Sequence, residues 1–383
     1  MRVLSVTWGI HDDNIQGLAT NLTGAGIVIH NICECIGRRC DSYVMIGNTA
    51  MKADKSGNIQ YLANNLESLT EKDNEKRLNL LIEGFNKNVE LIKPDIINFH
   101  GTGDFIFNCI KICIKREIKY VVTIHLYIEK KLNIPGTEKA KKYLSDIFSL
   151  PTVNVMAVGN GMREKILTDF PHVGKDNIYV IANGTDYIAV RSDESIKRKL
   201  GIENKKILIL AGTINARKNQ LQVVEAYKLL SDDLKCKIAV VFCGKDSLDG
   251  RLQEAIDTSG YKHMLHYVGA IPATDMYKYY SIADGYIMPS LAEGLSIACL
   301  EALRYGIPQI MFKDSECAED LSDPKVCVLA EERSSEALSR AIERWYDTNW
   351  DMEYIKRYSQ YFSMERVADD YIEYYKNVLA SNT

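Results

Sequence analysis

Short apolar runs alternate with longer segments of helical periodicity along almost the whole chain. The runs are rich in β-branched residues, which predicts buried strands with helices between them. Because alternating strands and helices form mostly parallel sheets covered on both faces, we predict an α/β fold. The predicted strands are Arg2–Thr7, Ser42–Ile46, Asp95–Phe99, Tyr120–Thr123, Asn154–Val158, Ile178–Ile181, Lys206–Ala211, Lys237–Phe242, Met264–Val268, Gly285–Met288, Pro308–Met311 and Val326–Leu329.

The alternation breaks once, between Asp186 and Gly201, where the chain is polar and has no strand pattern. We place a domain junction there and predict two doubly wound, Rossmann-like domains in tandem, at residues 1–186 and 187–351. Ligands of such folds bind at the carboxyl edges of the sheets, so two facing edges predict an interdomain cleft. The last stretch, Met352 to Leu379, is helical, and its many tyrosines predict amphipathic packing.

The composition is typical of a soluble globular protein, because 46% of the 383 residues are hydrophobic and 26% are charged. The net charge of −4 gives no electrostatic case for nucleic-acid binding. No apolar run approaches the roughly 18–20 residues that span a bilayer. The first residues lack the pattern of a signal peptide, and we expect a cytoplasmic protein. The ten cysteines form no Cys-x-x-Cys motif, so we expect buried thiols and no metal site.

The most informative segment is Pro289–Pro308, which follows a predicted strand. Glu293 and Gly294 form a turn, and Ser296 is a suitable N-cap for a helix that ends at Gly306. The N-terminus of such a helix presents backbone N–H groups and a positive dipole end to the carboxyl edge of the sheet. The segment therefore predicts a binding site for a diphosphate.

The groups that would bind the diphosphate are the backbone N–H groups of Leu295, Ser296 and Ile297. Glu301 lies inside the same helix, roughly 9 Å from Leu295 at 1.5 Å rise per residue. This separation suits a diphosphate and a ribose, whose diol a carboxylate binds through two acceptor oxygens.

Other candidates stand at further predicted strand ends. Lys218 lies in the loop Gly212–Gln220, where its ammonium group can contact a diphosphate. His100 and His125 each follow a strand of the first domain and are expected at its carboxyl edge. Gly244 and the backbone around Val268 are expected near the nucleotide base.

Closely spaced glycines allow the backbone to approach a ligand, because they carry no side chain. Gly24 and Gly26 precede a helix that we expect to run to about Gly37. Ile29 occupies the third glycine position of the dinucleotide-binding fingerprint, which argues against a nicotinamide-dependent oxidoreductase.

Glu293 and Glu301, with Ala302, Gly306 and Pro308 after them, resemble the E-x7-E motif of retaining GT-B-fold glycosyltransferases of family 4. Further segments resemble those of this family in the same order, and the resemblance covers essentially the whole chain. They are Ser281–Ser290 before the motif, Ile181–Asp186, which closes the first domain, and Ala211–Gln220, the phosphate-clamp loop. Residues Thr23–Ile27 resemble the glycine-rich loop of the family.

The resemblance implies a hexosyltransferase that retains the anomeric configuration, uses a nucleotide-diphosphate sugar (UDP on the family pattern) and needs no metal or other cofactor. It implies that Lys218 clamps the diphosphate, Glu293 contacts the transferred sugar, and His125 orients that sugar. His100 is assigned to the acceptor side. The family has an arginine where this chain has Thr213, and Arg217 is the candidate to replace it.

By the same resemblance, the final helix packs back on the first domain and the acceptor is a glycan or glycolipid of bacterial surface polysaccharide synthesis. Residues 104–142 hold nine Lys or Arg against four Asp or Glu. This region is either a solvated helix face or a patch that meets an anionic membrane or a lipid-linked acceptor. The alternatives are an epimerase or phosphorylase on the same fold, and a sugar-nucleotide-binding partner without activity.

Overall fold

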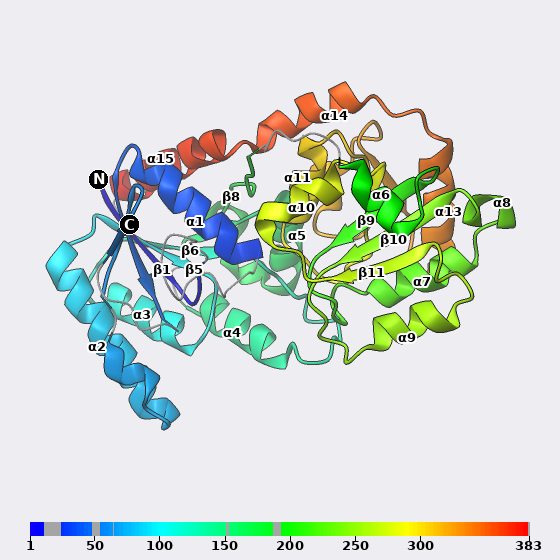
Figure 1. Ribbon diagram of the computed structural model, residues 1–383. Coiled ribbons are helices and arrows are strands. Elements are labelled where there is room, and N and C mark those ends of the chain that lie inside the picture. The colour runs from blue at the N-terminus through cyan, green and yellow to red at the C-terminus, as the bar shows by residue number, and fades with distance from the viewer. Residues whose placement is uncertain (11–23, 48–53, 64, 151–152, 187–192, 382–383) are drawn as a thin grey trace. The chain divides into compact units, whose positions relative to one another are not determined.

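The computed structural model describes residues 1–10, 24–47, 54–63, 65–150, 153–186 and 193–381, and it divides the chain into two compact units. The first unit contains Met1–Gly184 and Phe362–Thr383, and the second contains Thr185–Tyr361. Each unit has its own sheet (Figure 1).

Within the described residues, the sheet of the first unit has eight strands in the order β3-β4-β2-β1-β5-β6-β7-β8. Every neighbouring pair is parallel except β3 and β4. Strands such as β5 and β6 are buried along their whole length, and most of their residues are accordingly apolar. The strands are β1 (Arg2–Thr7), β2 (Asp41–Ile46), β3 (Asp54–Ser56), β4 (Ile59–Tyr61), β5 (Ile96–His100), β6 (Tyr120–Ile124), β7 (Val155–Ala157) and β8 (Ile178–Val180).

Helices cover both faces of this sheet. On one face α1 lies against α15, and on the other α2, α3 and α4 follow one another in contact (Figure 1). Inside the first unit, α15 is tied to the sheet by Asn98, whose Nδ2 donates to the hydroxyl of Tyr375 at 2.7 Å. The helices are α1 (Gly24–Gly37), α2 (Asn74–Ile92), α3 (Asp104–Lys115), α4 (Glu138–Phe148), α5 (Asn160–Asp169) and α15 (Met364–Ala380), with short 3₁₀ turns at Leu66–Leu69, Pro171–Val173 and Lys175–Asn177.

The sheet of the second unit has six parallel strands in the order β11-β10-β9-β12-β13-β14. They are β9 (Lys206–Ala211), β10 (Ile238–Cys243), β11 (Leu265–Gly269), β12 (Gly285–Met288), β13 (Gln309–Phe312) and β14 (Cys327–Ala330). Helix α7 contacts α9 and α13, and α11 contacts α14. The helices are α6 (Glu194–Leu200), α7 (Gln220–Lys228), α8 (Asp232–Lys235), α9 (Arg251–Thr258), α10 (Ala273–Tyr280), α11 (Ile297–Arg304), α12 (Ala318–Leu321), α13 (Ser335–Asp347) and α14 (Met352–Ser359).

In both sheets the strand order reverses beside the first strand of the unit. The chain moves outward from β1 to β2 and then crosses to β5, and it moves outward from β9 to β10 and β11 and then crosses to β12. The connections that follow these two neighbouring strands therefore run to opposite faces of the sheet. A crevice opens between them at the carboxyl ends of the strands. The places to search for ligand-binding groups are the loops after β1 and β5 and the loops after β9 and β12.

The C-terminal segment differs from the expectation of one helix on the first domain. It forms two helices, separated by a 3₁₀ turn at Gln360–Phe362. Helix α14 belongs to the second unit, where the hydroxyls of Tyr354 and Tyr358 donate to Asp323 Oδ2 and to the backbone oxygen of Asp320. Only α15 packs within the first unit, against α1. The tyrosine pattern predicted packing correctly but did not show that the segment divides between two units.

Candidate active site

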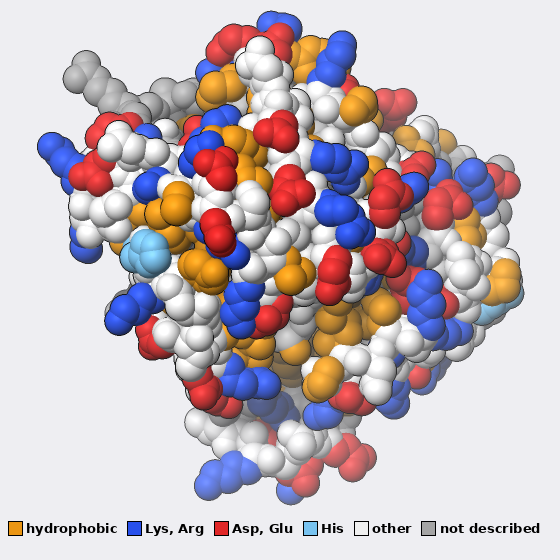
Figure 2. Space-filling view, turned by 90° about the vertical axis from the view of Figure 1, so that its right-hand side faces the viewer, with side chains coloured by type: hydrophobic (Ala, Val, Ile, Leu, Met, Phe, Trp, Pro, Cys, Tyr) orange, Lys and Arg blue, Asp and Glu red, His pale blue; other side chains and the backbone are white. Residues whose placement is uncertain are grey.

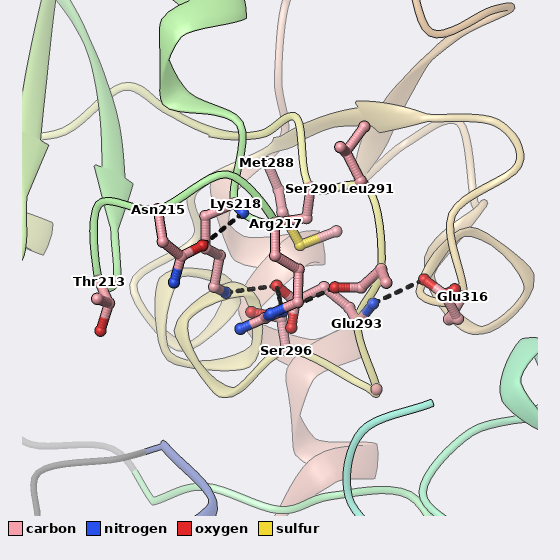
Figure 3. A network of polar contacts seen from close by, with 12 residues as sticks. Thr213, Asn215, Arg217, Lys218, Met288, Ser290, Leu291, Glu293, Ser296 and Glu316 are labelled. Atoms are coloured by element: carbon pink, nitrogen blue, oxygen red, sulfur yellow. Dashed lines mark hydrogen bonds and ion pairs between the residues drawn. The ribbon is translucent and has the colours of Figure 1, made fainter. Parts of the chain in front are cut away.

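Two loops of the second unit meet at the switch point of its sheet. The loop after β9 ends at Asn219, whose φ of 57° lies in the left-handed region that asparagine tolerates. The backbone N–H of Leu291, in the loop after β12, donates to the oxygen of Arg217 at 2.8 Å. The amide of Asn219 donates to the oxygen of Pro289 at 3.3 Å. These bonds hold the two loops side by side (Figure 3).

Glu293 occupies the centre of this contact and is only 7% exposed. Its Oε1 lies 2.6 Å from Lys218 Nζ and 2.8 Å from Arg217 Nη1 (Figure 3). Arg217 Nη1 also donates to the oxygen of Ala292 at 2.7 Å. Burial alone would raise the pKa of Glu293, but the charges of Lys218 and Arg217 outweigh it and leave this pKa below its usual value. The cluster is therefore a carboxylate held between two cations.

A third loop, after β13, fixes the backbone around Glu293. The N–H of Glu293 donates to Oε2 of Glu316 at 2.9 Å, and Glu316 is almost fully buried. The thiol of Cys317 donates to the oxygen of Gly294 at 3.0 Å, and the N–H of Ser296 reaches Cys317 Sγ at 3.4 Å. The Ser296 N–H, which we expect to bind a diphosphate, therefore already has an acceptor in this structure. Sulfur is a weak acceptor, so this N–H remains only lightly engaged.

The predicted helix after Glu293 is present as α11, with Ser296 at the N-cap position, although the Ser296 side chain makes no capping bond. Leu295 is buried, and Ile297 is the first helical residue. The chain leaves the helix through Gly306, whose φ of 78° favours glycine. Three of the predicted site residues thus lie at the start of one helix.

Glu301 projects from α11 and has one hydrogen-bond partner that the sequence did not reveal. The hydroxyl of Tyr280, at the end of α10, donates to Glu301 Oε2 at 2.8 Å. The Tyr280 ring stacks on Tyr305, with 5.7 Å between centroids. Burial raises the pKa of Glu301 to about 7, and the bond from Tyr280 opposes part of this rise. Glu301 therefore titrates near neutral pH.

The remaining candidates of the second unit stand at the ends of β9, β10 and β11. Gly244 has a φ of 157°, and a Cβ there would lie 1.9 Å from the oxygen of Gly212, so no larger residue fits. The hydroxyl of Tyr267 donates to the oxygen of Gly244 at 3.0 Å, and Val268 is half-buried in β11. Thr213 is exposed and lies to one side of the Glu293 cluster (Figure 3). Arg217, in contrast, brings its guanidinium to Glu293.

The two predicted histidines of the first unit come together. His100 ends β5, His125 follows the neighbouring strand β6, and His100 Nδ1 lies 3.1 Å from His125 Nε2. The rings are stacked, and the outer nitrogens His100 Nε2 and His125 Nδ1 are buried without a hydrogen-bond partner. Burial lowers the pKa of His125 to about 4, and burial with the charge of His125 lowers that of His100. Both imidazoles are uncharged at neutral pH.

The histidine pair lines a cavity of about 410 Å³ at the switch point of the first sheet, between the loops after β1 and β5. Ala25, in the first turn of α1, also lines this histidine cavity. Gly24 and Gly26 lie within the first turn of that helix, so they do not form a loop before it as expected. Thr23 lies outside the described residues.

The basic region 104–142 is partly neutralised by contacts within the first unit. Lys142 pairs with Asp146, and Lys131 pairs with Glu129. The ammonium of Lys141 donates to the backbone oxygens of Lys130 and Leu132. Figure 2 shows another side of the molecule, where α8 and α13 lie in Figure 1, and basic and acidic side chains are intermixed over much of that surface. The described residues include no helix long and apolar enough to cross a membrane.

The described residues also contain no group of three or more His, Cys, Asp or Glu side chains placed to hold a metal ion. All ten cysteines are free, and most are buried. Burial raises the pKa of thiols such as Cys33 and Cys299 to about 12, as expected for cysteines that serve as apolar core residues.

Two family models match consecutive parts of this chain. The model of glycosyltransferase family 4 matches residues 22–187, and that of glycosyl transferases group 1 matches residues 192–362. Together they cover most of the sequence, and the chain belongs to this family of GT-B-fold glycosyltransferases. The predicted membership in the family 4, group 1 glycosyltransferases with the GT-B fold is thus confirmed.

Curated relatives share only modest identity with this chain. O-antigen chain mannosyltransferase B of Escherichia coli is 23% identical over 51% of this chain and 52% of its own length. Alpha-maltose-1-phosphate synthase of Mycolicibacterium smegmatis is 24% identical over 59% of this chain and 63% of its own length. The chain therefore spans less than two thirds of these relatives.

Solved structures match over nearly the full length. Sucrose-phosphate synthase of Thermosynechococcus elongatus has a TM-score of 0.74 at 14% identity, covering 99% of this chain and 100% of its own. HepE of Anabaena in complex with UDP has a TM-score of 0.73 at 13% identity, covering 98% and 100%. At such low identity the likeness shows the fold, and it confirms the prediction of two Rossmann-like domains.

Proposed function

We propose that this chain is a hexosyltransferase that moves a hexose or N-acetylhexosamine from a nucleotide-diphosphate sugar to a hydroxyl of a glycan or glycolipid. The observation that carries the proposal is the cluster of Glu293, Lys218 and Arg217 at the start of α11. A carboxylate between two cations, beside a helix N-terminus at a switch point, suits a sugar diphosphate. Mannosyltransferases among the relatives, and a structural neighbour bound to UDP-glucose, support the same reading.

In this proposal the diphosphate lies against Lys218 and the start of α11. Its negative charge grows as the bond to the sugar breaks, and the Lys218 ammonium and the α11 dipole stabilise that charge. The Ser296 N–H can exchange its weak sulfur acceptor for a phosphate oxygen. Arg217 and the Glu316 carboxylate hold Glu293 in place, so that its carboxylate faces the transferred sugar.

Glu301 binds the ribose diol in the same proposal, and Tyr280 fixes the orientation of its carboxylate. His125 orients the sugar as an uncharged hydrogen-bonding group, because its pKa of about 4 leaves no proton to add charge at neutral pH. Retention of the anomeric configuration, UDP as the nucleotide and independence from metal ions belong to the proposal. So do action in surface polysaccharide synthesis, a cytoplasmic location and peripheral membrane contact through residues 104–142.

The test is turnover of a radiolabelled panel of UDP-glucose, UDP-N-acetylglucosamine and GDP-mannose, with and without glycolipid acceptors and in excess EDTA. We expect label to enter the acceptor from one donor, without loss of rate in EDTA, and the product to keep the donor's anomeric configuration by NMR. Epimerisation of a donor without acceptor, phosphate-dependent cleavage, or binding of donors without turnover would contradict the proposal and favour its alternatives.

A further inference from the structure

A second cavity of the first unit, of about 420 Å³, adjoins the histidine cavity. The two cavities share Trp8 and Thr102 in their linings, so they meet at the switch point of the first sheet. Each lies within the range of roughly 300–1,000 Å³ that is usual for small-molecule sites. We call the second one the cationic cavity, because its lining includes Arg77 and Lys139 with Asn74, Gly103 and Tyr143.

The two cations of this cavity have no acidic partner among the residues that the structure describes. Within the described part of the chain, neither Arg77 nor Lys139 forms a salt bridge, and Arg77 Nε is buried without a hydrogen-bond partner. A buried donor without an acceptor is costly, and a guanidinium is best satisfied by a carboxylate or phosphate. The cavity thus holds unused capacity for an anion.

One acid also lines the cavity. Asp104 lies in the first turn of α3, and its Oδ2 accepts a hydrogen bond from the Tyr143 hydroxyl at 3.2 Å. Two cations against one anion leave the cavity with a net positive charge, while Asp104 offers an acceptor to a hydroxyl group. A ligand that carries both an anionic group and hydroxyls fits this set.

Trp8 forms the wall that the two cavities share. It directly follows β1 and is 44% exposed, which is unusual for a tryptophan. Its ring is held by Phe105, with 6.1 Å between centroids, and by Gly47, where a Cβ would lie 2.7 Å from the indole. A rigid, partly exposed indole is suited to pack against the apolar C–H face of a sugar ring.

We propose that the cationic cavity binds the anionic group of the acceptor, a phosphate or a carboxylate carried on a sugar. The sugar ring packs on Trp8, Asp104 accepts from one of its hydroxyls, and the attacked hydroxyl lies in the histidine cavity. This inference rests on the proposed transfer to a sugar hydroxyl and adds the chemical class of the acceptor. Arg77 and Lys139 are then specificity-determining residues for a negatively charged sugar.

The test uses quenching of Trp8 fluorescence in the full chain, because Trp8 is the one tryptophan of residues 1–184. Glucose 6-phosphate, glucuronate and glucose are the probes, and Trp8→Phe identifies the signal. We expect saturable quenching by at least one anionic probe, and we expect the affinity for glucose to be about tenfold lower. Binding of glucose 6-phosphate alone points to a phosphate-bearing acceptor, and binding of glucuronate alone points to a uronic acid.

The variants Arg77→Gln and Lys139→Gln should each lower the affinity for the anionic probe about tenfold and leave the affinity for glucose unchanged. Arg77→Lys should restore part of the lost affinity. Arg38→Gln, at an exposed arginine outside both cavities, is the matched control. Circular dichroism checks that each variant is folded. Equal binding of glucose and both anions, or parent affinity in the Arg77→Gln, Lys139→Gln double variant, would overturn the inference.

A parallel UDP titration separates this inference from the proposed function. We expect the Arg77 and Lys139 variants to bind UDP like the parent, because neither residue belongs to the donor cluster of the second unit. If the parent fails to bind UDP while Arg77 still selects anionic sugars, the proposed function fails and the anion site stands. If UDP binds and the anions do not, the acceptor class is wrong and the proposed function stands.

Discussion

The two switch points of this chain carry different chemistry at equivalent places in their sheets. At the second, Lys218 and Arg217 are already paired with Glu293, and three loops hold the cluster by hydrogen bonds. At the first, two uncharged histidines and the unpaired cation Arg77 line open cavities. The comparison shows that the doubly wound topology sets where a ligand binds, while the side chains after each strand decide which ligand.

The difference also extends to protonation. Burial lowers the pKa of His125 to about 4, and burial raises that of Glu301 to about 7. Both shifts favour the uncharged form of the group, since burial penalises charge on either type of side chain. The pKa shift is therefore downward for the histidine of the first unit and upward for the glutamate of the second, because histidine loses its charge by releasing a proton and glutamate by binding one.

The largest expected effect is that of Glu293→Gln on turnover. We expect kcat to fall by about 100-fold or more, because a charge placed at the reacting sugar is lost. UDP affinity should stay equal or rise, since Lys218 and Arg217 no longer share their charge with a carboxylate. Steady-state kinetics and calorimetry measure the two quantities, and Glu254→Gln, at an exposed glutamate of α9, is the control. Unchanged turnover would remove Glu293 from the site.

A smaller effect is expected from the protonation of Glu301. The ribose diol donates to the carboxylate, so binding favours the deprotonated form, and UDP affinity should weaken up to about tenfold as pH falls from 7 to 6. Glu301→Gln should remove this pH dependence of the UDP affinity. The titration of UDP itself affects the parent and the variant equally, so it cancels when their affinities are compared. Tyr280→Phe removes the bond that lowers the pKa, so the transition should move to higher pH. Identical pH profiles of parent and Glu301→Gln would contradict the assignment.

The contrast between the two units also extends to stability. For His125 the unfolded chain binds a proton with a pKa near 6.5 and the folded chain near 4, so stability falls as pH drops through this window. For Glu301 the folded pKa of about 7 exceeds the unfolded pKa near 4.5. Its contribution to the free energy of unfolding is therefore fully present below pH 4.5 and is lost as the pH rises to about 7. Urea unfolding of His125→Gln and Glu301→Gln at several pH values measures both slopes. Slopes of the same sign would contradict the contrast between the two units.

Much of the fold could be predicted, because the strands of parallel sheets are buried on both faces and stand out as apolar runs. All twelve predicted strands occur, and their ends shift by at most one residue. The two that were missed, β3 and β4, are three residues long, and β3 is exposed at the sheet edge with the sequence Asp-Lys-Ser. Too few side chains point inward there to produce a pattern.

The site was predicted as a set of positions and not as a set of contacts. His100 and His125 could be placed at one edge because their strands are neighbours, yet their pairing depends on ring orientation. The bond between the Glu293 N–H and Glu316 joins loops from distant segments, and no spacing in the sequence indicates it. A signal for Glu316 existed in its place just after β13, at the same carboxyl edge. Tyr280 gave no signal, because it resembles any tyrosine at a helix end.

The most direct test of the account is calorimetric titration of UDP into the parent, Lys218→Ala, Glu301→Ala and the control Lys228→Ala. A charged hydrogen bond contributes roughly 1.5–3 kcal/mol, so Lys218→Ala should lower the affinity for UDP by about 10- to 100-fold. Glu301→Ala should lower this affinity less, because the bonds lost are those to a neutral diol. Lys228→Ala should keep the affinity of the parent, because the ammonium of Lys228 pairs with Glu225 on α7. Parent affinity in both Lys218→Ala and Glu301→Ala would show that the second unit does not bind a nucleotide diphosphate at this cluster.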